Sequence, residues 1–150
     1  MWRSWRLAGA MLAVGLAAAT PQLAQGSPGS GALDFLLFAA LAVLFSPLPF
    51  PRSVSAAEAQ ERGAVDGRPI VYWRPGCRYC LRLRARLGRD ARTAHWVDIW
   101  RDAAGAAAVR RIAGGNETVP TVVVDGQPYV NPAPRWLRDQ LRKQTNQKAA

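Results

Sequence analysis

The only two cysteines of this 150-residue chain, Cys77 and Cys80, are separated by two residues in the segment Trp73-Arg74-Pro75-Gly76-Cys77-Arg78-Tyr79-Cys80. An apolar, β-type run at residues 70–73 leads into this segment, and a helix-type run as far as Leu87 leads out of it. A Cys-x-x-Cys pair at a strand-to-helix turn is typical of redox chemistry. The segment therefore predicts a strand, a tight turn and a helix that carry two sulfur atoms at the start of the helix.

This placement predicts different properties for the two sulfurs. Cys77 would lie at the helix N-terminus, where unpaired backbone N–H groups and the helix dipole favour an anion. Arg74 and Arg78 add positive charge beside it. All three effects favour the thiolate, which is the attacking species in disulfide exchange. Cys80, one turn further on, is expected to be more buried and to resolve a mixed disulfide.

Other interpretations of the cysteine pair fit less well. A structural zinc site needs about four ligands, and the chain offers only His95 as a further Cys or His ligand. A structural disulfide would close only a four-residue loop, and so short a closure stabilises little. A degenerate or metal-cluster-binding relative of a redox protein stays open as an alternative.

The formal net charge of +10 comes mainly from arginine, which supplies 18 of the 20 basic residues. From Asp66 onward, 16 basic residues face 7 acidic ones, so nucleic acid is a natural first candidate partner. No nucleic-acid-binding motif and no basic stripe interleaved with stacking aromatic residues is present, which favours a solvated basic surface and no nucleic-acid partner. Attraction to anionic lipid, or to a thiol substrate that carries a carboxylate, is compatible with this charge.

The first 51 residues are predicted to form a two-helix membrane anchor. Two apolar stretches, at about residues 5–23 and 32–50, are joined by an uncharged loop at residues 20–31. The second is about long enough to cross a bilayer, which takes roughly 20 residues. A signal peptide is the alternative for the first stretch, because basic residues precede it and Ala17-Ala18-Ala19 resembles a cleavage site. The second apolar stretch favours the hairpin.

Arginines at the outer ends of the two stretches predict the orientation of the anchor. Arg3 and Arg6 precede the first stretch, Arg52 and Arg62 follow the second, and the connecting loop has no Lys or Arg. The positive-inside rule then places both ends in the cytoplasm. We therefore expect a protein of the cell (inner) membrane whose catalytic domain faces the cytoplasm.

The remainder of the chain reads as a linker at residues 52–68, an α/β domain at 69–143 and a polar tail at 144–150. Within the domain, Cys80, Leu83 and Leu87 would face inward from the first helix, Asp102 would cap the second helix, and Asp125-Gly126 would form a hairpin turn. Asn131 is expected to cap the last helix, with Pro132 in its first turn. The expected elements are strands at 70–73, 94–100, 121–124 and 127–130 and helices at 78–87, 103–113 and from 132 onward, in the order β-α-β-α-β-β-α.

Several motifs, in this order, resemble the glutaredoxin family and most closely its mycoredoxin-type branch. They are Arg74 to Cys80, then Gly114-Gly115-Asn116-Glu117-Thr118-Val119-Pro120-Thr121, then Asp125-Gly126 and Asn131-Pro132. The resemblance covers about half of the chain, residues 68–141, and leaves the apolar N-terminal region outside. It implies a thioredoxin-like α/β fold, here preceded by a transmembrane helical hairpin.

The resemblance also implies roles for individual residues. Cys77 would be the nucleophile and Cys80 the resolving thiol. Arg74, Tyr79, Thr118, Val119 and Pro120 would bind the low-molecular-weight thiol, with Val119 pairing through its backbone and Pro120 as a cis-proline. Arg78 departs from the family pattern, where Pro or Gly is frequent, and this departure bears on the reduction potential of the pair.

Together these features predict a membrane-anchored thiol–disulfide oxidoreductase that reduces mixed disulfides between proteins and a small thiol. Mycothiol is the expected co-substrate and glutathione the alternative, with no metal. Two other functions remain open: a non-catalytic client-docking or iron–sulfur-binding module, and an extracytoplasmic thiol oxidant. The presence of Cys80 disfavours the module, because such members usually have one active-site cysteine. An oxidant would require the opposite topology or a cleaved first stretch.

Overall fold

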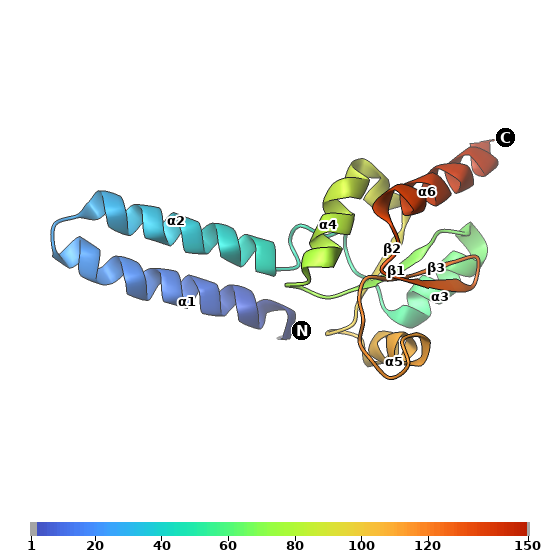
Figure 1. Ribbon diagram of the computed structural model, residues 1–150, viewed down its shortest axis with the longest axis horizontal. Helices are drawn as coiled ribbons and strands as arrows, with labels where there is room; N and C mark the ends of the chain where they lie inside the picture. The colour runs from blue at the N-terminus through green and yellow to red at the C-terminus, as the bar shows by residue number, and fades with distance from the viewer. Residues whose placement is uncertain (1–2, 150) are drawn as a thin grey trace. The chain divides into compact units, whose positions relative to one another are not determined.

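The computed structural model describes residues 3–149 and divides into two compact units, Met1–Pro49 and Phe50–Ala150. Figure 1 labels the helices and strands of both units. The first unit is a hairpin of two helices, α1 (Arg3–Ala24) and α2 (Pro28–Phe45). The second unit is a four-stranded sheet with helices on both faces. A thioredoxin-like domain preceded by a helical hairpin, as the sequence predicted, is therefore confirmed.

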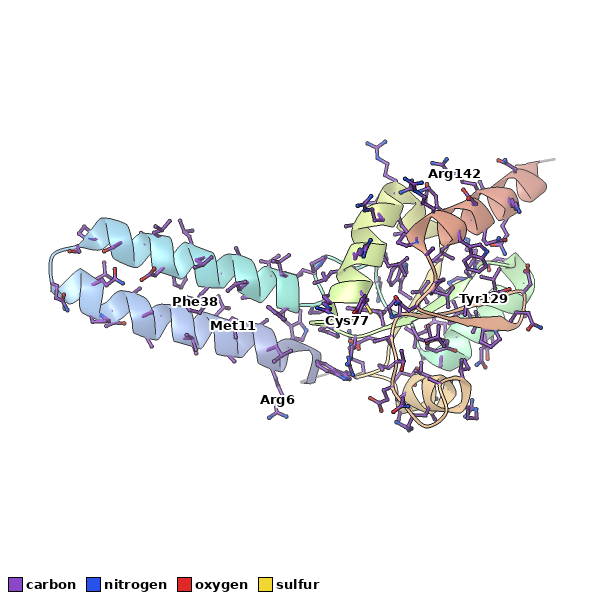
Figure 2. The ribbon with its side chains drawn as sticks, in the orientation of Figure 1. Arg6, Met11, Phe38, Cys77, Tyr129 and Arg142 are labelled. Atoms are coloured by element: carbon purple, nitrogen blue, oxygen red, sulfur yellow. The ribbon has the colours of Figure 1, made fainter. Side chains whose placement is uncertain are left out.

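In the hairpin, α1 and α2 run antiparallel and side by side (Figure 1). A Cβ atom placed on Gly15 would lie 2.5 Å from the Cβ of Phe38, so glycine is what lets the two helices approach here. Near the turn, Gln22 donates a hydrogen bond to the carboxylate of Asp34. Figure 2 shows Met11 and Phe38 on the facing sides of the two helices.

The loop expected at residues 20–31 is shorter in the structure. Helix α1 continues through Pro21 to Ala24, and α2 already begins at Pro28. Pro28 fits there because the first helical position needs no backbone N–H donor. Both helices are long and apolar enough to cross a membrane, although a signal sequence near the N-terminus would meet the same criteria.

The sheet of the second unit has the strand order β2-β1-β3-β4. Strand β1 (Ile70–Trp73) pairs in parallel with β2 (His95–Asp98) and antiparallel with β3 (Thr121–Val124), which forms a hairpin with β4 (Gln127–Val130). All residues of β1 and β2 are buried, because helices cover both faces. The expected hairpin turn is confirmed, with positive φ angles of 49° at Asp125 and 77° at Gly126.

Helices α4 (Arg78–Leu87) and α6 (Pro134–Ala149) and the 3₁₀ helix η1 (Gly88–Thr93) pack together over one face of the sheet (Figure 1). Helices α3 (Ala56–Asp66) and α5 (Ala103–Ile112) cover the other face. Helix α4 directs Cys80, Leu83 and Leu87 into the core, as predicted. Asp102 caps α5, as predicted, accepting hydrogen bonds from the backbone amides of Ala104 and Gly105.

The segment expected to be a linker at residues 52–68 is instead part of the folded domain. The Phe50 ring stacks on Trp73 with 3.7 Å between ring centroids, and Ala56 and Ala59 are buried in the same core. The backbone amide of Val54 donates to the carbonyl of Trp96, and Ser53 forms a bridge with that strand. This segment therefore covers the free edge of β2, which would otherwise leave backbone groups unpaired. The domain begins near Phe50 and not at residue 69.

Three ends, one of β2 and both of α6, differ from the expectations. Strand β2 stops at Asp98, short of Trp100, because the Asp98 carboxylate accepts the backbone N–H of Trp100 and turns the chain. Asn131 does not cap the last helix: it has a left-handed φ of 48°, and α6 begins only at Pro134. At the other end, α6 continues through the expected polar tail as far as Ala149.

Candidate active site

The turn between β1 and α4 places Cys77 at the first capping position of the helix. Gly76 has a φ of 73°, a left-handed conformation that glycine adopts without strain and that redirects the chain after Pro75. Cys77 then takes the N-cap position of α4, and its Sγ accepts a hydrogen bond from the backbone N–H of Cys80 at 3.2 Å. The Cys77 sulfur thus caps the helix, as a side-chain oxygen does in most helices. Figure 2 shows Cys77 at this end of α4.

The surroundings of Cys77 lower the pKa of its thiol from 9.0 to about 6. The largest contribution is the hydrogen bond with the Cys80 side chain, followed among the favourable ones by the backbone N–H groups of Cys80 and Tyr79 and by the charge of Arg74. Partial burial acts in the opposite direction and does not prevail. At neutral pH this sulfur is therefore mostly a thiolate, the form that attacks disulfides.

Cys80 lies one helical turn away in an opposite environment. It is fully buried, and this burial, together with the neighbouring Cys77 sulfur, raises the pKa of its thiol. A buried thiol that keeps its proton can donate a hydrogen bond to a thiolate at Cys77 and so stabilise it. The two cysteines therefore form an asymmetric pair, one nucleophilic and one protonated, both in the free thiol state.

An open groove of about 670 Å³ lies beside the Cys77 sulfur. Five of the site residues predicted from the sequence line this groove. The lining residues come from the start of α4 and the turn before it, from the segment before β3 and from the end of β4. The lining residues are Arg74, Gly76, Cys77, Arg78, Tyr79, Asn116, Glu117, Thr118, Val119 and Asn131. Cys80 and Pro120 are the predicted site residues outside this lining, and both are buried.

The peptide bond between Val119 and Pro120 is cis, the isomer that the resemblance implied. The Val119 carbonyl lies 3.4 Å from the Cys77 sulfur and accepts a hydrogen bond from its thiol form. Pro120 in turn uses its carbonyl to accept the backbone N–H of Asn131 at 2.7 Å. Segments far apart in the sequence therefore meet at the nucleophile through backbone contacts.

The sequence did not indicate three of the lining residues, Asn116, Glu117 and Asn131, as site residues. Asn116 and Glu117 follow the two glycines that end α5, and Glu117 forms an ion pair with Arg110 at 2.5 Å. Their position just before the Thr-Val-Pro segment was the available signal. Asn131 had been assigned to helix capping, a frequent role for asparagine that obscured its place at the groove.

The two arginines near Cys77 do not act alike, which corrects the sequence-based expectation. Arg74 contributes to the low pKa of Cys77 and lies over the Trp100 ring, 5.9 Å from its centroid. Arg78 turns to Tyr79 instead: it donates a hydrogen bond to the phenol oxygen at 2.8 Å and lies 4.7 Å from the ring centroid. Position along the sequence indicated charge near the sulfur but not the direction of these side chains.

His95, the one further zinc ligand that the sequence offered, is held by the carboxylate of Asp66 at 2.9 Å. Within residues 3–149, no group of three or more His, Cys, Asp or Glu side chains is arranged to hold a metal ion. The groove is therefore best described by its sulfur chemistry and its polar lining.

A Cys-x-x-Cys pair at a helix start, opposite a cis-proline on a thioredoxin-like sheet, is the arrangement of thiol oxidoreductases. Residues 70–129 match the sequence model of the glutaredoxin family. Two proteins of Mycobacterium tuberculosis are similar, "Putative glutaredoxin MT3292" of strain CDC 1551 and "Putative glutaredoxin Rv3198A" of strain H37Rv. Each is 38% identical over 74 residues, which cover 49% of this chain and 88% of the relative.

The chain therefore belongs to the glutaredoxin family, a family of thiol oxidoreductases that use glutathione-like thiols as co-substrates. The match with the family begins at β1, so it does not include the α1–α2 hairpin or α3.

Proposed function

We propose that this protein is a membrane-anchored glutaredoxin that reduces mixed disulfides between proteins and a low-molecular-weight thiol, with mycothiol as that thiol. The observation that carries the proposal is the pairing of a Cys77 sulfur of pKa about 6 with a polar groove beside it. The thiolate supplies the nucleophile, and the groove offers room and hydrogen-bonding groups for the non-protein half of a mixed disulfide. Arg74, Tyr79, Thr118 and Val119 lie where they would contact it.

The proposed reaction has two exchange steps. The Cys77 thiolate attacks the small-thiol sulfur of the mixed disulfide, a new disulfide forms between Cys77 and the small thiol, and the client sulfur leaves as a thiolate that takes up a proton. A second small thiol then attacks the sulfur held by Cys77. It releases the Cys77 thiolate and forms the symmetric small-thiol disulfide, so that one free small thiol is consumed for each client thiol released. Cys80 serves to release Cys77 from stalled protein adducts.

The choice of mycothiol is supported by the mycoredoxin-like motif Gly114-Gly115-Asn116-Glu117-Thr118-Val119-Pro120 and by the mycobacterial origin of the similar proteins. The experiment is a reduction assay with one client peptide carried as a mycothiol or as a glutathione mixed disulfide. We expect faster turnover of the mycothiol adduct, and the variant Cys77→Ser gives the background. Faster turnover of the glutathione adduct would replace the co-substrate, and no turnover of either would remove the enzymatic proposal.

The hairpin is proposed to cross the membrane with both ends in the cytoplasm. Large apolar side chains on both helices are exposed to an extent unusual for a water-soluble unit; Leu33 and Leu36, for example, are 69% and 64% exposed. Arg6 lies near the start of α1 and Arg52 follows α2, while the turn between the helices carries no basic residue. A membrane surrounding these helices accounts for both features.

A reporter fused after Ala150 tests this topology. A reporter active only in the cytoplasm is expected to be active, and the mature chain is expected to retain residues 1–19. If the mature protein had lost this segment, or only a reporter that requires export were active, the domain would lie in an oxidising compartment. The protein would then be better described as a thiol oxidant.

A further inference from the structure

The two helical layers that cover the sheet carry very different charge. The layer formed by α4, η1 and α6 contains eleven basic residues and two acidic ones, Asp90 and Asp139. The opposite layer, α3 and α5, contains three of each. The net charge of the second unit is therefore concentrated on one face.

This difference shows that the basic face, formed by α4, η1 and α6, does not simply reflect a high arginine content of the whole chain. A bias of composition would enrich both layers, yet α3 and α5 together are neutral. On the basic face Arg82, Arg86 and Arg89 are exposed. Asp90 does little to offset them, because it already faces Arg138 and Arg142, whose Nε atoms lie 3.8 and 3.4 Å from its carboxylate.

The connection to the hairpin is the second observation. Helix α2 ends at Phe45, and Phe50 is already fixed in the core of the second unit by stacking on Trp73. Five residue steps span at most about 17 Å, whatever the orientation of the two units. With α2 in a bilayer, as the proposed function states, the domain is confined to the layer of water next to the lipid headgroups.

We propose that the face formed by α4, η1 and α6 binds anionic phospholipid headgroups of the membrane that holds the hairpin. Arginine suits this partner, because its guanidinium group makes paired hydrogen bonds with phosphate. Near an anionic leaflet each basic residue contributes about a fivefold gain in binding. Nucleic acid fits less well, because the two aromatic side chains of these helices already have ring partners: Tyr79 contacts Arg78, and Trp136 packs on Tyr129.

Hydrogen exchange of the full chain in lipid vesicles tests this inference. We expect amides of α4, η1 and α6 to exchange about 25-fold more slowly in vesicles with phosphatidylglycerol than in phosphatidylcholine alone, an effect of roughly two basic residues. Amides of α3 and α5 serve as an internal reference and are expected to be unchanged. Raising the salt from about 0.1 M to about 1 M shortens the screening length to about 3 Å, which is expected to abolish the difference.

Two variants with equal changes of net charge sharpen the test. Arg82→Glu/Arg86→Glu/Arg89→Glu removes charge from the basic face and is expected to abolish the lipid-dependent protection. Arg62→Glu/Arg101→Glu/Arg111→Glu removes exposed charge elsewhere and is expected to keep it. Circular dichroism establishes that both variants are folded. Equal exchange in the two kinds of vesicle, or equal loss in both variants, would overturn the proposal, as would protection by single-stranded RNA but not by anionic vesicles.

The failure of the membrane anchor would be visible separately. If alkaline carbonate washed the chain off the vesicles, the proposed anchoring would be wrong. The same exchange measurement, with the chain added to preformed vesicles of both compositions, would still show whether the basic face binds anionic lipid.

Discussion

The start of α4 and the core one helical turn further on each hold a cysteine thiol, but the pKa values of the two thiols are shifted in opposite directions. At the tip, Cys77 is half-buried, caps the helix, and has a pKa lowered to about 6. In the core, Cys80 is fully buried and its pKa is raised. The two residues are three positions apart, so their difference arises from their surroundings: hydrogen bonding, burial and neighbouring charge.

This difference teaches how one helical turn can produce both a nucleophile and its proton-bearing partner. Free backbone N–H groups exist only at the start of a helix, and Cys77 is placed to accept one of them. At Cys80, burial and the neighbouring Cys77 sulfur disfavour a thiolate more than Arg74 favours it. Because two residues separate the cysteines, one lies at the start of the helix and the other in the buried core.

Removing the nucleophile is the most severe way to break this asymmetry. We expect Cys77→Ser to lower the rate of mixed-disulfide reduction by about a thousandfold or more, because a serine hydroxyl is not ionised at neutral pH and is a poor nucleophile toward sulfur. Steady-state turnover of a mixed-disulfide peptide measures this rate.

Cys80→Ser is the matched control, with the same atom exchanged one turn away. It is expected to retain a substantial part of the activity, because the proposed cycle needs only one thiolate. If both variants were equally inactive, a cycle through a disulfide between Cys77 and Cys80 would describe the protein better.

The pH dependence of alkylation sharpens the same comparison. A folded-state pKa of about 6 means that the Cys77 thiolate appears as pH rises through 6 and is nearly complete by pH 7. A cysteine of pKa 9.0 would be only about one percent ionised there, so Cys77 is expected to have about ninetyfold more thiolate. The rate of iodoacetamide labelling from pH 4 to 10, with Cys77→Ser as the blank, gives the titration curve. A midpoint near 9 would show that the helix start does not stabilise the anion.

The smallest expected effect separates the two neighbouring arginines. At pH 6, Arg74→Gln is expected to slow alkylation of Cys77 about twofold, because the positive charge that favours the thiolate is lost. Arg78→Gln is expected to leave the rate unchanged, since Arg78 is engaged with Tyr79. The same labelling assay measures both, and a larger effect of Arg78→Gln would reverse this assignment.

The parts that the sequence predicted well are those with a strong local signal. The alternation of apolar run, turn and amphipathic helix around Cys77 located β1 and α4 to the residue, and Asp125-Gly126 located the β3–β4 turn. The low pKa of Cys77 could be predicted for the same reason, because the helix start that contributes to it is a local feature.

The parts that the sequence did not predict depend on contacts between distant residues. The covering of β2 by residues 53–56 uses the short run Ser-Val-Ser-Ala, whose sequence alone does not indicate its contacts with Trp96 and Asp102. Asparagine is frequent both at helix caps and in left-handed turns. At Asn131, the hydrogen bond from its backbone N–H to the Pro120 carbonyl decides between the two. The directions of Arg74 and Arg78 likewise follow from the positions of Trp100 and Tyr79.

The stacking of Phe50 on Trp73 sets the range over which the nucleophile operates. Trp73 ends the strand that leads to Cys77 four residues later, so the chain enters the domain beside its reactive sulfur. With the hairpin in a bilayer, Cys77 is restricted to a volume a few tens of ångströms across, which corresponds to an effective concentration on the order of millimolar toward a thiol on a neighbouring membrane protein. Disulfides close to the membrane surface would thus be reduced ahead of identical ones on freely diffusing proteins, without any difference in intrinsic reactivity.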